Sequence, residues 1–246
     1  MKHLFVVNPV AGGNRKPEKM LDTIRSVMES RRAEYEIYFT RAPMDAAVKV
    51  KAEAETGQAL RVYAVGGDGT LNECANGAVG FSNTAVTHYP CGTGNDFIRM
   101  FGEEAALFRD LNRLASGVVR PIDVIDCNGR YCVNLCSTGF DARTGTDVHK
   151  YNKLPVIGGP CGYVVSLMVN MVKGINERMV ITTDGKRREG EFALVCACNG
   201  RFYGGGFNPM PEALPDDGVI DTIIVGKVTR LQFLGLVGKY AKGRDV

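Results

Sequence analysis

The order of the predicted elements constrains this chain most, because short β-like runs alternate with amphipathic helical patterns through its first half. The β-like runs cover residues 4–7, 36–39, 61–65 and 84–88. The helical patterns begin near Pro17 and Pro43, and two more cover residues 71–77 and 103–115. Strands that alternate with helices predict a parallel sheet covered on both faces.

The second half is richer in β-like segments and hairpin turns. Asn128-Gly129 and Asp184-Gly185 each lie between two such segments, and both dipeptides favour the type I′ turn of a hairpin. The predicted strands cover residues 121–127, 131–137, 179–183, 191–198 and 219–225. Helical stripes are predicted over residues 164–172 and 233–240.

This change of pattern predicts an α/β domain over residues 1–122 and a β-rich domain over residues 123–246. The 30 Lys and Arg residues nearly balance the 27 Asp and Glu residues, so a nucleic-acid partner is not expected. No apolar stretch approaches the roughly 20 residues that a membrane-spanning helix needs, and the N-terminus lacks a signal-peptide core. A cytoplasmic protein without a transmembrane segment is therefore predicted.

The eight cysteines form no Cys-x-x-Cys pair. Cys132, Cys136, Cys196 and Cys198 lie in strand-like runs and are interpreted as buried thiols, with a metal or disulfide role as the alternative.

The clearest chemical signal is the run Gly66-Gly67-Asp68-Gly69-Thr70-Leu71-Asn72-Glu73, which follows a predicted strand and begins a predicted helix. Its glycines let the backbone approach a ligand closely, and the N–H groups of such a turn bind phosphate. A carboxylate at Asp68 is unfavourable beside phosphates unless a cation bridges them, and Mg²⁺ is the natural choice. The alternative is a tight turn in which Asp68 caps the helix.

Two further glycine-containing loops follow predicted strands, Asn8-Pro9-Val10-Ala11-Gly12-Gly13 and Pro90-Cys91-Gly92-Thr93-Gly94-Asn95-Asp96-Phe97. Loops at the carboxyl ends of parallel strands converge on one crevice. Thr93 could then donate a hydrogen bond to a phosphate, and Asp96 could join Asp68 around a metal ion. The sequence has no Walker-type P-loop, and no dinucleotide fingerprint follows its first strand. His3 and His88 are interpreted as strand residues without a catalytic role.

These loops, taken in order, resemble those of the diacylglycerol kinase catalytic family, the bacterial lipid kinases that are similar to sphingosine and ceramide kinases. The matching motifs are Asn8-Pro9-x-Ala11-Gly12, the run from Gly66 to Glu73, Pro90-x-Gly92-Thr93-x-Asn95-Asp96-Phe97, Gly139-Phe140-Asp141-Ala142, Asn199-Gly200, Gly204-Gly205-Gly206 and Asp217-Gly218. The resemblance implies a Rossmann-like domain followed by a sandwich-like domain, with the active site in the cleft between them. It also implies transfer of phosphate from ATP to a lipid hydroxyl, with diacylglycerol as the first candidate.

The resemblance extends to individual residues. The nucleotide-binding residues would be Asn8, Pro9, Ala11, Gly12, Thr40, Gly66, Gly67, Asp68, Gly69, Thr70, Leu71, Asn72 and Thr93. Asp68, Asp96 and Asp123 would form the acidic cluster that organises catalytic Mg²⁺, although Asp123 could instead pair with an arginine as an ordinary strand residue. The residues Leu214, Asp217 and Val219 match a structural magnesium site, and a simple turn is the alternative there.

The general base is the main departure from the family pattern. Family members continue past the point where this chain stops, and they carry there an Asp-Gly-Glu motif whose acidic residue looks like the base. The base is therefore expected beyond residue 246, and the chain is either a fragment or a protein that lacks it. The rival functions are an NAD kinase, which shares the Gly-Gly-Asp-Gly-Thr turn, and a non-catalytic nucleotide- or lipid-binding protein.

The expected partner is a lipid at the membrane surface, contacted peripherally, and a homodimer is left open. Candidate lipid contacts are Lys186-Arg187-Arg188, the terminal helix and the segment 155–160. A solvated hairpin tip and a helix lead-in are the alternatives for the first and the last.

Overall fold

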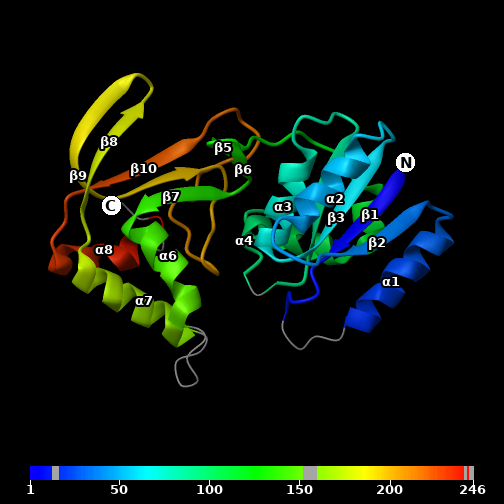
Figure 1. Ribbon diagram of the computed structural model, residues 1–246, viewed down its shortest axis with the longest axis horizontal. Coiled ribbons are helices and arrows are strands. Elements are labelled where there is room, and N and C mark those ends of the chain that lie inside the picture. The colour runs from blue at the N-terminus through cyan, green and yellow to red at the C-terminus, as the bar shows by residue number, and fades with distance from the viewer. Residues whose placement is uncertain (13–16, 93, 152–159, 241–242, 244–246) are drawn as a thin grey trace. The chain divides into compact units, whose positions relative to one another are not determined.

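The computed structural model describes residues 1–12, 17–92, 94–151, 160–240 and 243 (Figure 1). The chain divides into two compact units, Met1–Val133 and Asn134–Val246. Of the residues singled out in the sequence, Gly13, Thr93 and 155–159 lie outside the described part of the chain.

Unit 1 is built on a parallel four-stranded sheet in the order β2-β1-β3-β4, which confirms the α/β prediction. Its strands are β1 (Lys2–Val7), β2 (Tyr35–Phe39), β3 (Leu60–Gly66) and β4 (Thr84–Pro90). Its helices are α1 (Pro17–Ser30), α2 (Asp45–Ala54), α3 (Asp68–Ala78), the short α4 (Asp96–Arg99), the 3₁₀ helix η1 (Gly102–Arg109) and α5 (Leu111–Ser116).

Helices cover both faces of this sheet, as the sequence pattern predicted. Successive residues of a strand point to opposite faces. Leu4 and Val6 of β1 therefore pack in one buried cluster with residues of α2 and α3. Phe5 and Val7 pack in a second cluster with residues of α1 and α5. A strand that is buried on both faces has to be apolar at every position, which explains the unbroken apolar run that begins the sequence.

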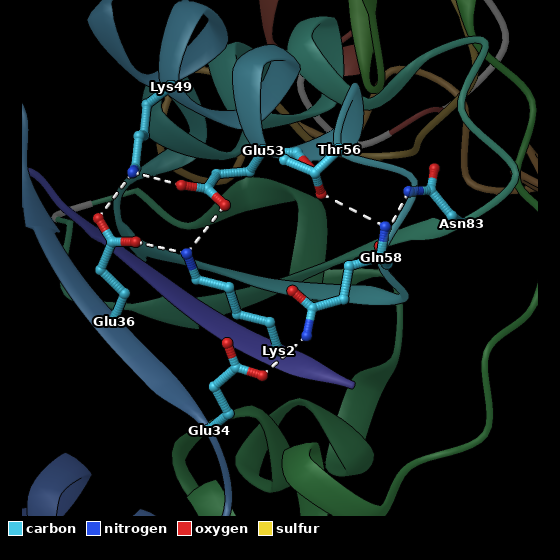
Figure 2. A network of polar contacts seen from close by, with 8 residues as sticks. All are labelled: Lys2, Glu34, Glu36, Lys49, Glu53, Thr56, Gln58 and Asn83. Atoms are coloured by element: carbon cyan, nitrogen blue, oxygen red, sulfur yellow. Dashed lines mark hydrogen bonds and ion pairs between the residues drawn. The ribbon is translucent and has the colours of Figure 1, made fainter.

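An alternating ring of charges lies where β1 and β2 begin (Figure 2). The Nζ of Lys2 is 2.7 Å from Glu36 and 2.8 Å from Glu53. The Nζ of Lys49 is 2.7 Å from Glu36 and 2.6 Å from Glu53. Partial burial alone would raise the pKa of Glu36 and of Glu53, but the two ammonium groups outweigh it and hold both pKa values below the usual carboxyl value.

The single helix predicted over residues 103–115 is wrong, because the segment is divided into η1 and α5. Asp110 lies between them with extended backbone, and its side chain accepts hydrogen bonds from the N–H groups of Asn112 and Arg113. An aspartate that caps a new helix in this way ends the previous one.

A two-stranded hairpin of β5 (Ile125–Cys127) and β6 (Arg130–Cys132) completes unit 1. Its turn has positive φ at Asn128 (53°) and Gly129 (81°), as predicted. The predicted strand over 131–137 is wrong as one element, because its residues belong to β6 and to a separate strand, β7 (Leu135–Gly139). The domain boundary predicted near residue 122 thus precedes the hairpin, whereas the division between the units follows it.

Unit 2 contains an antiparallel sheet in which β7, β8 (Glu177–Thr183) and β10 (Asp221–Gly226) all pair with the long strand β9 (Lys186–Cys198). Its helices are α6 (Phe140–Tyr151), α7 (Pro160–Lys173) and α8 (Arg230–Tyr240). Asp184 and Gly185 form the turn between β8 and β9 with positive φ, as predicted. The sequence pattern did not predict α6, and it predicted only the second half of β9.

Two buried layers hold unit 2 together. The helices pack through Phe140, Met171 and Phe233, with the rings of Phe140 and Phe233 4.5 Å apart. Cys196 and Cys198 are buried among apolar residues of the sheet, which confirms their interpretation as buried thiols. Cys132 and Cys136 are only half-buried, so that interpretation was too broad.

None of the described helices is both long enough and apolar enough to span a membrane.

Candidate functional site

The turn between β3 and α3 presents an open helix N-terminus. Gly67 is the N-cap of α3, and none of the described side chains caps this end of the helix. Asp68 is the first helical residue, and its Oδ1 accepts a hydrogen bond of 3.0 Å from the N–H of Phe97. The alternative in which Asp68 caps α3 is therefore wrong, because its carboxylate holds the next loop instead. The N–H groups of the first turn keep the arrangement that binds anions at helix N-termini.

The loop after β4 is tied to this turn through one carbonyl group. The oxygen of Gly66 accepts hydrogen bonds from the N–H groups of Cys91 (2.8 Å) and Gly92 (3.0 Å). Nε2 of the buried His88 lies 3.1 Å from the same oxygen and must donate to it. Burial lowers the pKa of His88, so the ring is neutral and serves to position the turn. The sequence analysis missed this role.

The approach of the two loops requires glycine at position 92. A Cβ atom placed on Gly92 would lie 2.5 Å from the Cα of Gly67, a distance that real Cβ atoms do not reach. The glycine thus permits the contact between backbones that brings the two loops together.

The loop after β1 joins the same edge of the sheet. The N–H of Asn8 donates to Val65 at 3.0 Å, and its Nδ2 donates to Oγ1 of Thr70 at 3.2 Å. The chain continues through Pro9, Ala11 and Gly12, which has a φ of 78°. Thr40, at the end of β2, donates its N–H to the carbonyl of Val7 at 2.9 Å. The predicted convergence of the three loops at the carboxyl edge of the sheet is therefore observed.

Two of the three predicted acidic residues come together here. A Cβ atom placed on Gly94 would lie 3.2 Å from Oδ2 of Asp68 and 3.4 Å from Oδ2 of Asp96, so both carboxylates flank this glycine. Asp96 is 5% exposed, and its Oδ1 lies 3.1 Å from Nε of Arg99. Asp123 is half-buried in the segment before β5. Among the described residues, no three His, Cys, Asp or Glu side chains form a group that could hold a metal ion, and the cluster of Asp68, Asp96 and Asp123 stays a prediction.

Asn72 has a contact that its predicted role did not include. Its Nδ2 donates to the carbonyl of Tyr131 at 3.2 Å, and its Oδ1 accepts from the N–H of Val133 at 3.1 Å. Asn76, one turn later on α3, both donates to and accepts from the backbone of Tyr131, at 2.7 and 2.9 Å. The two amides thus bind β6 as a neighbouring strand would. The signal in the sequence was a pair of asparagines four positions apart on the helix that begins at the glycine turn.

In unit 2, the residues predicted to bind structural magnesium lie in an exposed turn. Oδ1 of Asp217 accepts a hydrogen bond of 3.0 Å from the N–H of Val219, and Gly218 has a φ of 77°. Leu214 and Val219 are 44% and 52% exposed. This is the turn that the sequence analysis named as the alternative, and its remaining carboxylate and carbonyl oxygens are of the kind that Mg²⁺ prefers.

Asp141, in the motif Gly139-Phe140-Asp141-Ala142, lies at the start of α6 and accepts a hydrogen bond of 2.9 Å from the hydroxyl of Tyr203. Burial raises the pKa of its carboxyl, against the lowering effect of hydrogen bonds from Ser137 and Tyr203. The sequence analysis quoted this residue in a motif without giving it a function.

The whole of the sheet and its loops match one family model. The model of the diacylglycerol kinase catalytic domain matches residues 2–127. The chain belongs to the diacylglycerol kinase catalytic domain family. A second model, the YegS C-terminal NAD kinase beta sandwich-like domain, matches residues 134–246, which confirms the sandwich-like second domain expected from the sequence.

Several bacterial proteins are similar to this chain. A protein of Bacillus subtilis (strain 168) named "Diacylglycerol kinase" is 27% identical over 248 residues, which cover 100% of this chain and 81% of the relative. The "Putative lipid kinase SERP0390" of Staphylococcus epidermidis is 27% identical over 185 residues, and the match spans 58% of that relative. A crystal structure of a diacylglycerol kinase from Bacillus anthracis str. Sterne has 28% identity and a TM-score of 0.70, and the match covers 97% of this chain and 78% of that one.

Proposed function

We propose that this protein transfers the γ-phosphate of ATP, with Mg²⁺, to the hydroxyl group of a lipid, and that the lipid is diacylglycerol. The observation that carries the proposal is the meeting of three glycine-containing loops at the uncapped N-terminus of α3, with the carboxylate of Asp68 beside it. Membership of the diacylglycerol kinase catalytic domain family and the names of the relatives supply the reaction and the substrate class.

The residues at this edge of the sheet fit a nucleotide phosphate chain with its cation. Uncapped N–H groups at a helix N-terminus favour anions, and the close approach of Gly92 to Gly67 leaves backbone, without side chains, facing the space beside the turn. Asp68 and Asp96 offer the carboxylate oxygens that Mg²⁺ prefers. When bound, Mg²⁺ would neutralise charge on the phosphates, and catalysis of this type depends mainly on positioning and charge stabilisation.

The decisive experiment measures transfer of label from γ-labelled ATP with Mg²⁺ to a panel of lipids in detergent micelles, followed by chromatographic identification of the product. Asp68→Asn keeps the oxygen that accepts from Phe97 and removes the charge, so it should lower turnover about 100-fold or more without loss of fold. Asp110→Asn is the matched control, because Asp110 also accepts backbone N–H groups but caps α5 and belongs to none of the three loops.

Labelled diacylglycerol that disappears in Asp68→Asn and persists in Asp110→Asn would support the proposal. Labelling of NAD without labelling of any lipid would replace it with an NAD kinase. Saturable MgATP binding with no transfer to any acceptor would replace it with a non-catalytic nucleotide-binding function.

A further inference from the structure

One carbonyl oxygen in the turn after β3 accepts more hydrogen bonds than its burial requires. The oxygen of the buried Gly66 accepts from the N–H groups of Cys91 and Gly92 at 2.8 and 3.0 Å. Nε2 of His88 lies 3.1 Å from the same oxygen. A carbonyl oxygen has two lone pairs, and the two backbone donors already satisfy them. The third bond, from His88, is therefore not needed to satisfy this group.

The ring of His88 itself destabilises the core. It is 1% exposed, and Val86, two residues earlier on the same face of β4, packs in the cluster that contains residues of α2 and α3. Burial lowers the pKa of His88, so the neutral ring has a single N–H group, which its bond to Gly66 places on Nε2. Nδ1 remains as a buried acceptor, and it has no partner within the described part of the chain. An apolar side chain of similar size would avoid this penalty.

The bond from His88 acts on a peptide group that has little other restraint. The C=O of Gly66 and the N–H of Gly67 belong to one planar peptide, so a fixed oxygen also fixes the direction of that N–H. Glycine on both sides would otherwise let the peptide rotate. The two backbone donors come from the loop after β4, whereas His88 belongs to β4 itself, in register with Ala64 of β3. The bond therefore ties this peptide directly to the sheet.

The N–H of Gly67 is placed to bind a ligand. Gly67 is the N-cap of α3, and no acceptor in the described ranges of the chain bonds to its N–H. A Cβ atom on Gly92 would lie 3.1 Å from the nitrogen of Gly67, so only backbone fits beside this amide. Donors on a carbonyl oxygen polarise its peptide group and make the N–H of the same peptide a stronger donor. The surplus bond from His88 thus strengthens an amide that faces the candidate phosphate site.

We infer that His88 is a positioning residue for phosphoryl transfer, because it orients and polarises the peptide between Gly66 and Gly67 so that the N–H of Gly67 binds the phosphate chain of the nucleotide. The inference rests on the proposed function for the identity of this ligand. His88 is buried behind the turn and touches neither nucleotide nor lipid. Its effect appears in nucleotide binding, which needs no lipid acceptor, so the two proposals can fail separately.

The test compares His88→Leu with His88→Gln in the full chain. Leucine is close to histidine in size and has no side-chain N–H, whereas the amide of glutamine can place an N–H near the position of Nε2. Calorimetric titration with MgADP measures nucleotide affinity without turnover. His88→Leu should bind MgADP about fivefold or more weakly than the wild type, and His88→Gln should recover most of the affinity.

Stability distinguishes positioning from packing. In urea unfolding, His88→Leu should be at least as stable as the wild type, because the Gly66 oxygen keeps two donors and the unpartnered Nδ1 is gone. The matched control is His3→Leu. His3 is also buried in this sheet, its Nδ1 lies 2.8 Å from the hydroxyl of Tyr63, and it pairs with Arg61 at the opposite end of β3 from Gly66. This control should lose stability and bind MgADP like the wild type.

Nitrogen NMR of the imidazole tests the inference in the unaltered protein. The proton of His88 should be on Nε2, and the amide signal of Gly67 should shift more in His88→Leu than in His3→Leu. A proton on Nδ1 alone, or equal MgADP affinity in the wild type and His88→Leu, would overturn the inference. A clear loss of stability in His88→Leu, with His88→Gln equally impaired in binding, would also overturn it, because the ring would then serve packing.

Label transfer to lipid separates this inference from the proposed function. MgADP binding that weakens in His88→Leu, with no lipid labelled by the wild type, would uphold the role of His88 and contradict the lipid kinase. Labelling of lipid at the same kcat/KM for ATP in the wild type and His88→Leu would do the reverse. A wild-type protein that binds no nucleotide would overturn both.

Discussion

The backbone N–H of Phe97 donates a 3.0 Å hydrogen bond to Oδ1 of Asp68, so the residue expected to carry the catalytic charge also fixes the loop after β4. Hydrogen bonds to charged groups contribute about 1.5–3 kcal/mol when they are partly shielded from water. The proposed catalytic role of Asp68 can be separated from this structural role by substitution, because asparagine retains the acceptor oxygen and alanine does not.

We expect Asp68→Ala to lower the free energy of unfolding by about 1.5 kcal/mol or more, and Asp68→Asn to lower it by clearly less. Urea unfolding gives the two values. Hydrogen exchange of the segment that contains Phe97 should quicken in the alanine variant alone. Identical losses in the two variants would show that the bond to Phe97 contributes nothing.

The paired amides of α3 lead to a prediction about the hairpin. Asn76→Ala removes one donor to and one acceptor from the backbone of Tyr131, so the amide hydrogens of β6 should exchange faster and stability should fall by about 1–2 kcal/mol. Asn76→Asp keeps the acceptor and loses the donor, and it should have an intermediate effect. An unchanged exchange rate in the alanine variant would mean that β5 and the bonds of Asn72 hold β6 in place without Asn76.

The charge ring at the start of β1 makes stability depend on pH in the acid range (Figure 2). The pKa values of Glu36 and Glu53 are lowered in the folded state, so the unfolded state binds protons more readily. The ring therefore stabilises the protein fully above the unfolded carboxyl value of about 4.3, and its contribution disappears as the pH falls through the lower folded values.

Lys49→Met should remove much of this dependence, because Glu36 and Glu53 each lose one of their two ammonium partners. Urea unfolding from neutral pH down into the acid range should give a shallower decline for the variant than for the wild type. Lys51→Met is the control, since Lys51 has a single exposed partner at 3.9 Å. Parallel curves for wild type and Lys49→Met would contradict the prediction.

Asp141 should make stability depend on pH in the direction opposite to that of Glu36 and Glu53. Burial raises the pKa of its carboxyl in the folded state, so the folded state binds the proton more readily and stability falls as the pH rises through that window. Asp141→Asn should therefore gain stability relative to the wild type as the pH is raised toward neutrality. Tyr203→Phe removes a hydrogen bond that lowers the pKa of Asp141, so this variant should have a still higher Asp141 pKa than the wild type. Carbon-detected NMR titration of the Asp141 carboxyl measures the shift directly, and an ordinary value in both proteins would refute it.

Elements whose buried faces are apolar were predictable from the sequence. The apolar helical stripe that includes Ile24 and Met28 predicted α1. The continuous apolar run of residues 4–7 predicted β1, which is buried on both faces. The turn residues Asn128-Gly129 and Asp184-Gly185 predicted both hairpins, because the positive φ angles of these turns are set by the residue types in the turn and not by distant packing.

The helix α6 was missed because its buried face is largely polar. Thr144 and Asp147 are buried there, and Asp147 is held by Lys150, Lys173 and Asn170. A search for apolar periodicity does not detect a helix that packs through hydrogen bonds. The first half of β9 was missed for a related reason, since its charged residues extend with β8 into a mostly exposed pair of strands.

The sequence predicted which loops form the candidate site. Glycine turns after parallel strands indicate where backbones converge, and Asn8, Gly66–Asp68 and Gly92 do meet at one edge. The partners of individual side chains were not predictable in the same way. The bonds of Asn72 to β6, and of His88 to Gly66, join residues from different elements, and their geometry depends on the completed packing.

The pairing of β7, β8 and β10 with β9 alone has a consequence for how the chain folds during synthesis. Unit 1 has every strand of its parallel sheet once Pro90 has left the ribosome. In unit 2, Leu135 of β7 pairs with Cys198, so this strand is made long before its partner. We therefore expect the two sheets to form in succession, with β7 unpaired until β9 has been synthesised. A chaperone that binds the nascent chain would protect it most between the synthesis of β7 and that of β9.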